Sequence, residues 1–421
     1  MSVAQQHDRP HDQPQGDDPG TRPDGGARRA TIWLFAGVAG ATASTNYYNQ
    51  PLVDSIARGF GVSDSAAATS VTVAQVCYSL GLLLIVPSGD LLRRRRLATV
   101  LLALVALGLV AQGFAPTYPA FLAGLVLTAF GAVTSQVLVA FSASLAPPGR
   151  RAGTVGTVMS GMLLGILLGR SVAGLLSELG GWQTVYRVAA VLAVLALLGV
   201  RALAPEGGHE GPTPRYLAVL RSMPPLLVRY PRLVSRTLMG GLTFAGASAV
   251  FATMSLHLSR DPFDLSDGVI GLIGLVGVAG AVAATPVGRG VDRGWDRWLG
   301  LATISSLGLA WVLFSTWGAT SIVVFVVAMV LLDLGLQGTH VANQGVIQSL
   351  DDAARARITS LYMTGYFLGA TLGSAIGVAA WDAGGWTGIC VAGFVLLVLA
   401  YAAWGLDTVL ATRERRAASA H

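Results

Sequence analysis

Long apolar segments recur along almost the whole chain and limit what it can fold into. About twelve of them have roughly the 20 residues that an α-helix needs to cross a bilayer. Lipid offers no hydrogen-bond partner to a backbone, so such segments cross the membrane as helices. The sequence therefore predicts an all-α polytopic membrane protein, with spans near 31–54, 66–89, 97–116, 118–145, 152–178, 183–204, 234–258, 267–288, 298–317, 319–349, 357–381 and 386–408.

The composition supports this prediction, because 53% of the 421 residues are hydrophobic and only 12% are charged. A soluble chain would carry far more charge. The two cysteines, Cys77 and Cys390, lie in apolar runs, so we expect free packed thiols and no disulfide or metal site. No cofactor is expected. The basic residues should report membrane topology, and no nucleic-acid partner is expected.

The loop charges give an orientation. If the N-terminus is cytoplasmic, the outer loops retain only Arg58 and Arg260, whereas the other loop arginines fall inside, including Arg232 and Arg236 of the central loop. The positive-inside rule then places both termini in the cytoplasm. All 28 basic residues are Arg, which favours a GC-rich bacterial genome and therefore the bacterial plasma membrane.

Five segments are predicted. They are a disordered cytoplasmic tail at 1–29 that is no signal peptide, a six-helix bundle at 30–204, a central cytoplasmic loop at 205–233, a second six-helix bundle at 234–409, and a cytoplasmic tail at 410–421.

The two bundles are related in sequence. The residues Gly161, Gly165, Gly169, Gly180, Gly181 and Trp182 return 204 residues later as Gly365, Gly369, Gly373, Gly384, Gly385 and Trp386. The same offset relates Gln136 to His340. A parallel repeat of this kind predicts two pseudo-symmetric bundles with a binding site between them near the membrane midplane.

One predicted helix carries a polar stripe. Asp333, Gln337, His340 and Gln344 fall within about 60° of arc on a helix. Polar groups in a membrane need partners inside the protein, so the stripe should line an aqueous or substrate cavity. The alternative is a set of interhelical hydrogen bonds that only hold the bundle together. Asp333 is the candidate proton carrier, and His340 either relays the proton or binds substrate.

Two further helices carry polar residues in their outer halves. The first helix contains Asn46, Tyr47, Asn49 and Gln50 before Pro51, which suits recognition of a neutral or zwitterionic organic molecule. Arg170 lies deep in the fifth helix, where an unpaired guanidinium is costly. It either pairs with Asp54 or Glu178, forms an outer gate, or contacts an anionic substrate. The candidate substrate ligands are therefore Asn46, Tyr47, Asn49, Gln50, Gln136, Arg170, Gln337, His340, Asn343, Tyr362 and Tyr366.

The segment Gly288 to Arg297, GRGVDRGWDR, resembles the inter-helix loop signature of the major facilitator superfamily, and the resemblance covers the chain from residue 31. The first copy, Pro87 to Arg96, departs from the signature, with Leu91 in place of its usual arginine. In that family the loop acid and arginine hold one access state. The resemblance therefore implies gates formed by Asp90 with Arg94 or Arg95, and by Asp292 with Arg293.

The glycines of the fifth helix look like a degenerate drug-antiporter signature, with Arg170 in place of its proline. NYYNQP in the first helix and YMTGYFLG at Tyr362 to Gly369 look like a bacterial branch close to drug and metabolite efflux proteins. The resemblance implies a secondary transporter without enzymatic activity, acting as a monomer, that exports small organic molecules in exchange for protons.

Two alternatives stay open. A proton-coupled uptake symporter or facilitator for a metabolite would share every motif, and only the direction of flux separates it from an exporter. A membrane-embedded enzyme using Asp333 and His340 as acid and base belongs to a different class. The sequence contains no nucleophile motif, metal-ligand cluster or phosphate loop that supports an enzyme.

Overall fold

The computed structural model describes residues 25–85, 92–146, 151–206, 221–277, 286–291, 293–351 and 354–419. Helices are the regular elements of these residues. They are α1 (Gly25–Ser44), η1 (Thr45–Tyr47), α2 (Val53–Phe60), α3 (Asp64–Leu84), α4 (Arg94–Gly113), α5 (Tyr118–Gly131), α6 (Thr134–Leu145), α7 (Arg151–Gly180), α8 (Trp182–Leu203), α10 (Pro224–Arg229), α11 (Pro231–Leu258), α12 (Asp267–Ile273), η3 (Gly274–Val276), α14 (Asp296–Ser315), η4 (Trp317–Ala319), α15 (Ile322–Gln348) and α16 (Arg355–Ser419).

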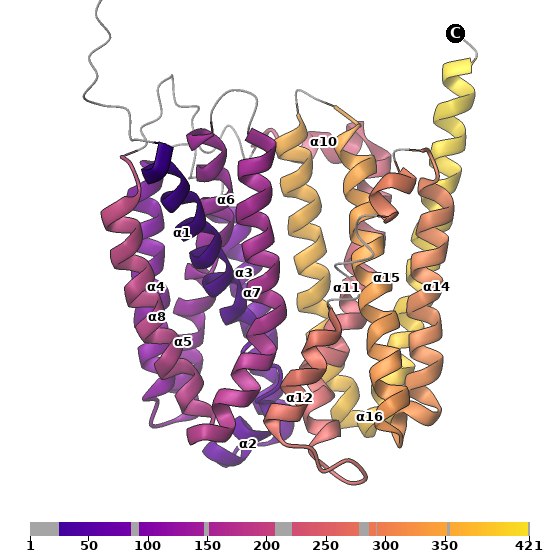
Figure 1. Ribbon diagram of the computed structural model, residues 1–421. Helices are drawn as coiled ribbons and strands as arrows, with labels where there is room; N and C mark the ends of the chain where they lie inside the picture. The colour runs from indigo at the N-terminus through magenta and orange to yellow at the C-terminus, as the bar shows by residue number, and fades with distance from the viewer. Residues whose placement is uncertain are drawn as a thin grey trace, which may run out of the picture.

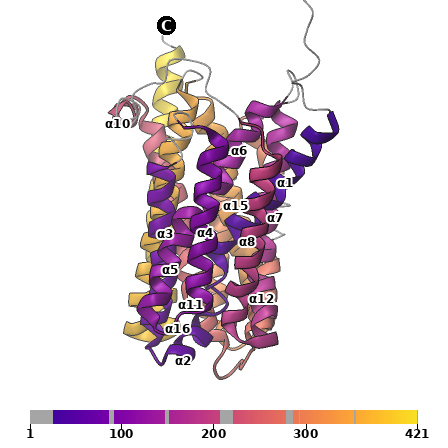
Figure 2. The ribbon, with the colours of Figure 1, turned by 90° about the vertical axis from the view of Figure 1, so that its left-hand side faces the viewer.

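The helices form two groups that lie side by side (Figure 1). Helices α1 to α8 make the N-terminal half, and α11 to α16 make the C-terminal half. The first turn of α1 and the last turn of α16 lie at one end of the bundle, here named the termini side, and α2 lies at the other end, the α2 side. Figure 2, turned by 90°, shows that the long helices of both halves run between these two ends.

Within the described residues, nine helices are long and apolar enough to cross a membrane. One of them, at Arg357–Glu414, consists of two helices joined at Gly384 and Gly385, where the backbone leaves the helical conformation. The prediction of an all-α polytopic protein is therefore confirmed. The number of twelve spans stays a prediction.

The repeated glycines make the same contacts in both halves. A Cβ on Gly165 of α7 would overlap the backbone of Gly40 in α1, and a Cβ on Gly369 of α16 would overlap the backbone of Gly241 in α11. Small residues at such positions let two helix backbones approach closely. The repeat is thus a repeat of helix-to-helix contacts.

The glycine–tryptophan pairs of the repeat also correspond. Gly181 and Gly385 both have positive φ, at 78° and 55°, which a residue without a Cβ adopts at low cost. Trp182 packs edge-on against Phe121 with ring centroids 5.5 Å apart. Trp386 packs in its own half against Phe325, also at 5.5 Å.

The first predicted span is interrupted. The sequence predicts one helix over 31–54, but α1 ends at Ser44, a 3₁₀ turn follows, and α2 begins only at Val53. Pro51 cannot donate a backbone hydrogen bond, which disfavours a continuous helix. The hydroxyl of Thr45 also bonds back to the carbonyl of Thr42, a contact that often bends helices.

Candidate functional site

Arg170 lies in α7 and is only 6% exposed. Its Nε donates a hydrogen bond of 2.7 Å to Oε1 of Gln50, in the interruption after α1. The guanidinium carbon lies 5.1 Å from the ring centroid of Tyr47 and 4.1 Å from that of Phe251, distances typical of cation–π contacts. Phe251 belongs to α11, so residues of both halves hold this arginine.

The two acids considered from the sequence as partners of Arg170 are engaged elsewhere. Asp54 forms an ion pair of 2.8 Å with Arg58, and Glu178 accepts hydrogen bonds from residues at the start of α12. Of the three alternatives considered for Arg170, an ion pair with one of these acids is therefore not the one that the structure shows. The break in the first span brings Gln50, one turn before Asp54, against α7 instead.

Asp333 lies in α15 and is 4% exposed. Its Oδ2 has no hydrogen-bond partner within the part of the chain that the structure describes. A Cβ on Gly277 would lie 3.5 Å from this oxygen, and a Cβ on Gly274 would lie 2.8 Å from the Cβ of Arg170. Both charged residues thus pack against the same short segment, 274–277, and they interact electrostatically. The structure brings together an acid and a base that the sequence analysis did not pair.

His340 lies two turns from Asp333 on the same helix. Its Nδ1 is 3.1 Å from the hydroxyl of Tyr362, and its ring centroid is 4.5 Å from that of Tyr366. The structure therefore joins the predicted stripe of α15 to the two predicted tyrosines of α16.

Gln136 of α6 stands at the position of the repeat that His340 occupies in α15. Its Nε2 is 3.6 Å from the sulfur of Met162, and Met162 is the repeat counterpart of Tyr366. Gln136 and His340 are each partly exposed although they belong to long apolar spans, Tyr118–Leu145 and Ile322–Gln348. The two halves therefore present polar side chains at equivalent places.

The remaining amide candidates separate into different surroundings. Asn343 is fully buried and donates to the backbone carbonyl of Arg236 at 3.1 Å, so it joins two helices of the C-terminal half. Asn49 donates to the hydroxyl of Ser70 at 3.1 Å. Asn46 is buried, and its Oδ1 has no partner among the described residues. Gln337 is partly exposed, one turn after Asp333.

The predicted gates are only partly visible. Asp90 and Asp292 lie outside the described residues. Arg94 donates to the carbonyl of Ala140 at 3.4 Å. Arg95 lies 3.7 Å from Glu206, and the guanidinium of Arg293 lies 5.8 Å from the ring centroid of Trp295.

A buried charge network lies in the C-terminal half, among residues that the sequence did not single out. Arg232 and Arg236 were predicted to be loop residues, but both lie in α11, and Arg236 is 1% exposed. Its Nη2 lies 2.6 Å from Asp407 of α16 and 2.9 Å from Asp296 of α14. Arg232 joins the same acids at 3.4 and 3.2 Å. An acid such as Asp407 inside an apolar run was the available signal, because a buried acid needs a cation.

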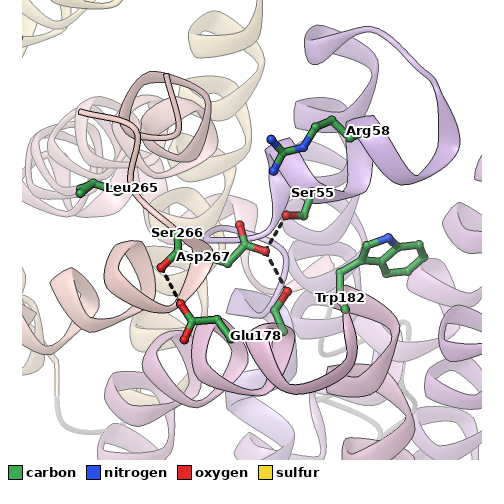
Figure 3. A pocket seen from close by; sticks show the side chains of 9 residues that line it. Ser55, Arg58, Glu178, Trp182, Leu265, Ser266 and Asp267 are labelled. Atoms are coloured by element: carbon green, nitrogen blue, oxygen red, sulfur yellow. Dashed lines mark hydrogen bonds between the residues drawn. The ribbon is translucent and has the colours of Figure 1, made fainter. Parts of the chain in front are cut away.

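Hydrogen bonds join the two halves at the α2 side. Oδ2 of Asp267, at the start of α12, accepts from the hydroxyls of Ser55 in α2 at 2.6 Å and Ser177 in α7 at 2.8 Å. Nearby, Glu178 of α7 accepts from Ser266. These residues line an open depression of about 360 Å³ (Figure 3).

More contacts extend this connection. The hydroxyl of Ser255 in α11 donates to the carbonyl of Pro51 at 3.0 Å. Arg260 lies 2.6 Å from Asp64 at the start of α3. We name the set of cross-half contacts made by Ser55, Ser177, Asp267, Ser255 and Arg260 the α2-side seam.

Comparisons with known proteins agree on a family. Residues 33–353 match the Major Facilitator Superfamily. The chain is 41% identical over 385 residues to the "Uncharacterized transporter YgaY" of Escherichia coli O157:H7, covering 91% of this chain and 97% of that one. It is 32% identical to the "Probable transporter SCO4007" of Streptomyces coelicolor, covering 91% and 89%.

Solved structures agree on the fold. A bacterial homolog of the human lysosomal transporter Spinster superposes with a TM-score of 0.75 at 13% identity, covering 92% of this chain and 97% of that chain. The family and the relatives are transporters. They therefore exclude the membrane-embedded enzyme that the sequence had left open as an alternative. The chain belongs to the major facilitator superfamily and is a multi-pass membrane transporter.

Proposed function

We propose that the chain exports small organic molecules, such as drugs or metabolites, in exchange for protons, by alternating access in a bacterial plasma membrane. The observation that carries the proposal is Asp333, a buried acid whose Oδ2 has no partner among the described residues and which packs, with Arg170 of the other half, against the segment 274–277. Titratable groups inside a membrane protein commonly mark proton or substrate pathways.

Asp333 couples the two ligands because a proton and a substrate compete for its carboxylate. Protonation removes the charge of Asp333 and with it the attraction to Arg170 across the halves. A substrate bound to the charged form keeps the proton out. His340, with its contact to Tyr362, lies on the termini side of Asp333 and relays the proton toward that side.

Charge distribution supports a cytoplasmic termini side. Arg94, Arg95, Arg293 and the C-terminal arginines lie there, whereas Arg58 and Arg260 belong to the α2 side. The α2-side seam then closes the transporter toward the outside. Release of substrate to the outside requires these hydrogen bonds to break, while the predicted gates of Asp90 and Asp292 close the cytoplasmic side. The transporter acts as a monomer.

The test is growth of an efflux-deficient bacterium on a panel of toxic small molecules, with wild type and Asp333→Asn at matched membrane levels. The wild type should protect and Asp333→Asn should not. Asp333→Glu, which keeps a titratable carboxyl, should retain part of the protection. Asp382→Asn, which changes an exposed acid of α16, is the matched control and should protect like the wild type.

Two results would decide against the proposal. Unchanged protection by Asp333→Asn removes this acid from the mechanism. Greater sensitivity of cells that express the wild type indicates uptake.

A further inference from the structure

The site holds one buried cation and one buried anion, and each comes from a different half. Arg170 and Asp333 are 6% and 4% exposed. Both pack against the segment 274–277, where a Cβ on Gly274 would press on Arg170 and a Cβ on Gly277 would contact Asp333. The glycines therefore let one segment lie directly against both charged residues. A ligand bound between the halves at this segment meets both charges at once.

The charge balance of the site restricts the ligand. A ligand with a single positive charge is attracted by Asp333 but repelled by Arg170. A ligand with a single negative charge is attracted by Arg170 but repelled by Asp333. Either ligand leaves a net charge in a site of low dielectric constant, where an uncompensated charge is costly. A ligand that carries both charges satisfies both residues and leaves the site neutral.

Unpartnered polar atoms near each charge match the two ends of such a ligand. Gln50 is fully buried, and its Oε1 already accepts from Arg170, while its Nε2 has no partner within the described part of the chain. Nε2 is a hydrogen-bond donor on the same amide that contacts the guanidinium, so it suits a carboxylate bound beside Arg170. At Asp333, Oδ2, which likewise has no partner among the described residues, is an acceptor and suits an ammonium group.

The surroundings of the charges indicate a small organic ligand. The rings of Tyr47 and Phe251 lie against Arg170 and offer apolar surface beside the charged groups. A phosphate would bring up to two negative charges to a single guanidinium and leave the site unbalanced. A carboxylate brings one.

We propose that the substrate is a small zwitterion of the amino-acid type, held with its carboxylate toward Arg170 and Gln50 and its ammonium group toward Asp333. This inference rests on the proposed function, because the ammonium group competes with the proton for Asp333 and so produces exchange. It adds the substrate class and gives Arg170 the role of selecting for the carboxylate.

The test uses the full-length protein in proteoliposomes and follows substrate-driven proton movement. Two matched sets of probes separate the charges. The first set is phenylalanine, 2-phenylethylamine without the carboxylate, and 3-phenylpropanoate without the ammonium group. The second set is leucine, 3-methylbutylamine and 4-methylpentanoate. The wild type should respond to the zwitterion of at least one set about tenfold more strongly than to its two relatives, as expected for loss of a charge-assisted contact.

Arg170→Gln should lower the response to the zwitterion by about tenfold or more and raise the response to the amine. Arg170→Lys keeps the positive charge but lacks the fork-shaped set of donors. Its response to the zwitterion should lie between those of the wild type and Arg170→Gln. Arg187→Gln is the matched control. Arg187 is another arginine of the N-terminal half, and its contacts are the carbonyl of Gly113 and the ring of Phe114. Its loss should change neither response.

Three outcomes would overturn the inference. They are a wild type that prefers the amine or the acid, a wild type that moves no probe, and an Arg170→Gln variant that folds but keeps the preference for the zwitterion. None of them rejects export through Asp333, which the growth assay decides separately. Folding of each variant is checked by its elution as a single species, and Gln50→Ala replaces Arg170→Gln if the latter does not fold.

Discussion

In the N-terminal half, Gly165 of α7 meets Gly40 of α1; in the C-terminal half, Gly369 of α16 meets Gly241 of α11. Five residues before Gly40 and Gly241, however, the halves differ completely. Phe35 occupies this place in α1 and packs on an apolar core. Arg236 occupies it in α11 and joins the buried Asp407 and the partly exposed Asp296. The comparison teaches that the backbone scaffold is repeated and the buried charge is not.

The largest expected effect tests this difference in charge. Arg236→Leu should lower the free energy of unfolding by about 3 kcal/mol, because it removes the more buried of the two arginines that pair with Asp407 and Asp296 and leaves only Arg232 to compensate them. The equivalent Phe35→Leu should cost only about 1 kcal/mol. Thermal unfolding of the detergent-solubilised protein measures both. Adding Asp407→Leu to Arg236→Leu should recover part of the loss, and similar losses for Arg236→Leu and Phe35→Leu would show that the halves do not differ here.

The second prediction tests the shared scaffold. Gly165→Ala and Gly369→Ala should each lower stability by about 1–3 kcal/mol, since the new methyl group overlaps a neighbouring helix backbone. Gly37→Ala and Gly405→Ala are controls, one in each half, because a Cβ at either place meets nothing within 4 Å. Both controls should be neutral or slightly stabilising. A large loss at only one of Gly165 and Gly369 would break the equivalence of the two contacts.

The third prediction concerns the contact between the halves. Asp267→Ala removes the acceptor that Ser55 and Ser177 share and should loosen the α2-side seam. The readout is a cysteine in place of Ser374, which is buried against Thr72 of the other half, in a background without Cys77 and Cys390. Its labelling by a membrane-impermeant maleimide should accelerate by several-fold, about what loss of 1 kcal/mol of hydrogen bonding gives.

Asp382→Ala is the control for the labelling experiment, because Asp382 is exposed. If it accelerates labelling as much as Asp267→Ala does, the seam is not what excludes the reagent.

The smallest expected effect is at the termini side of the C-terminal half. The hydroxyl of Tyr230 donates to Asp351 at 2.7 Å, and this bond raises the pKa of Tyr230 above its ordinary value of 10.0. The stabilising contribution is therefore complete below pH 10.0 and is lost as the pH rises through the raised pKa. Tyr230→Phe should lower Tm slightly at neutral pH and by less above the raised pKa. A decrease in Tm that stays constant with pH would contradict this assignment.

The features that could be predicted from the sequence are those for which a residue type has a single physical explanation. The glycines of the repeat located the helix contacts, and the acid and imidazole in apolar surroundings singled out the candidate site residues on α15, whose role stays a prediction. Prediction from the sequence failed at Arg236, because an arginine near a helix end gives the same sequence pattern whether its side chain faces the cytoplasm or a buried acid. It also failed to pair Arg170 with Gln50 and Phe251. These contacts depend on the break in the first span and on how two halves dock, and neither leaves a pattern along the chain.

The placement of Arg170 and Asp333 has a consequence for the history of the chain. Their counterparts, 204 residues away, are Ser374 and Ala129. A six-helix ancestor that paired with a copy of itself would have carried the same residue at both places, and therefore two such charge pairs or none. A single set of opposite charges therefore needs both halves in one chain, where each half carries its own residue at the equivalent place.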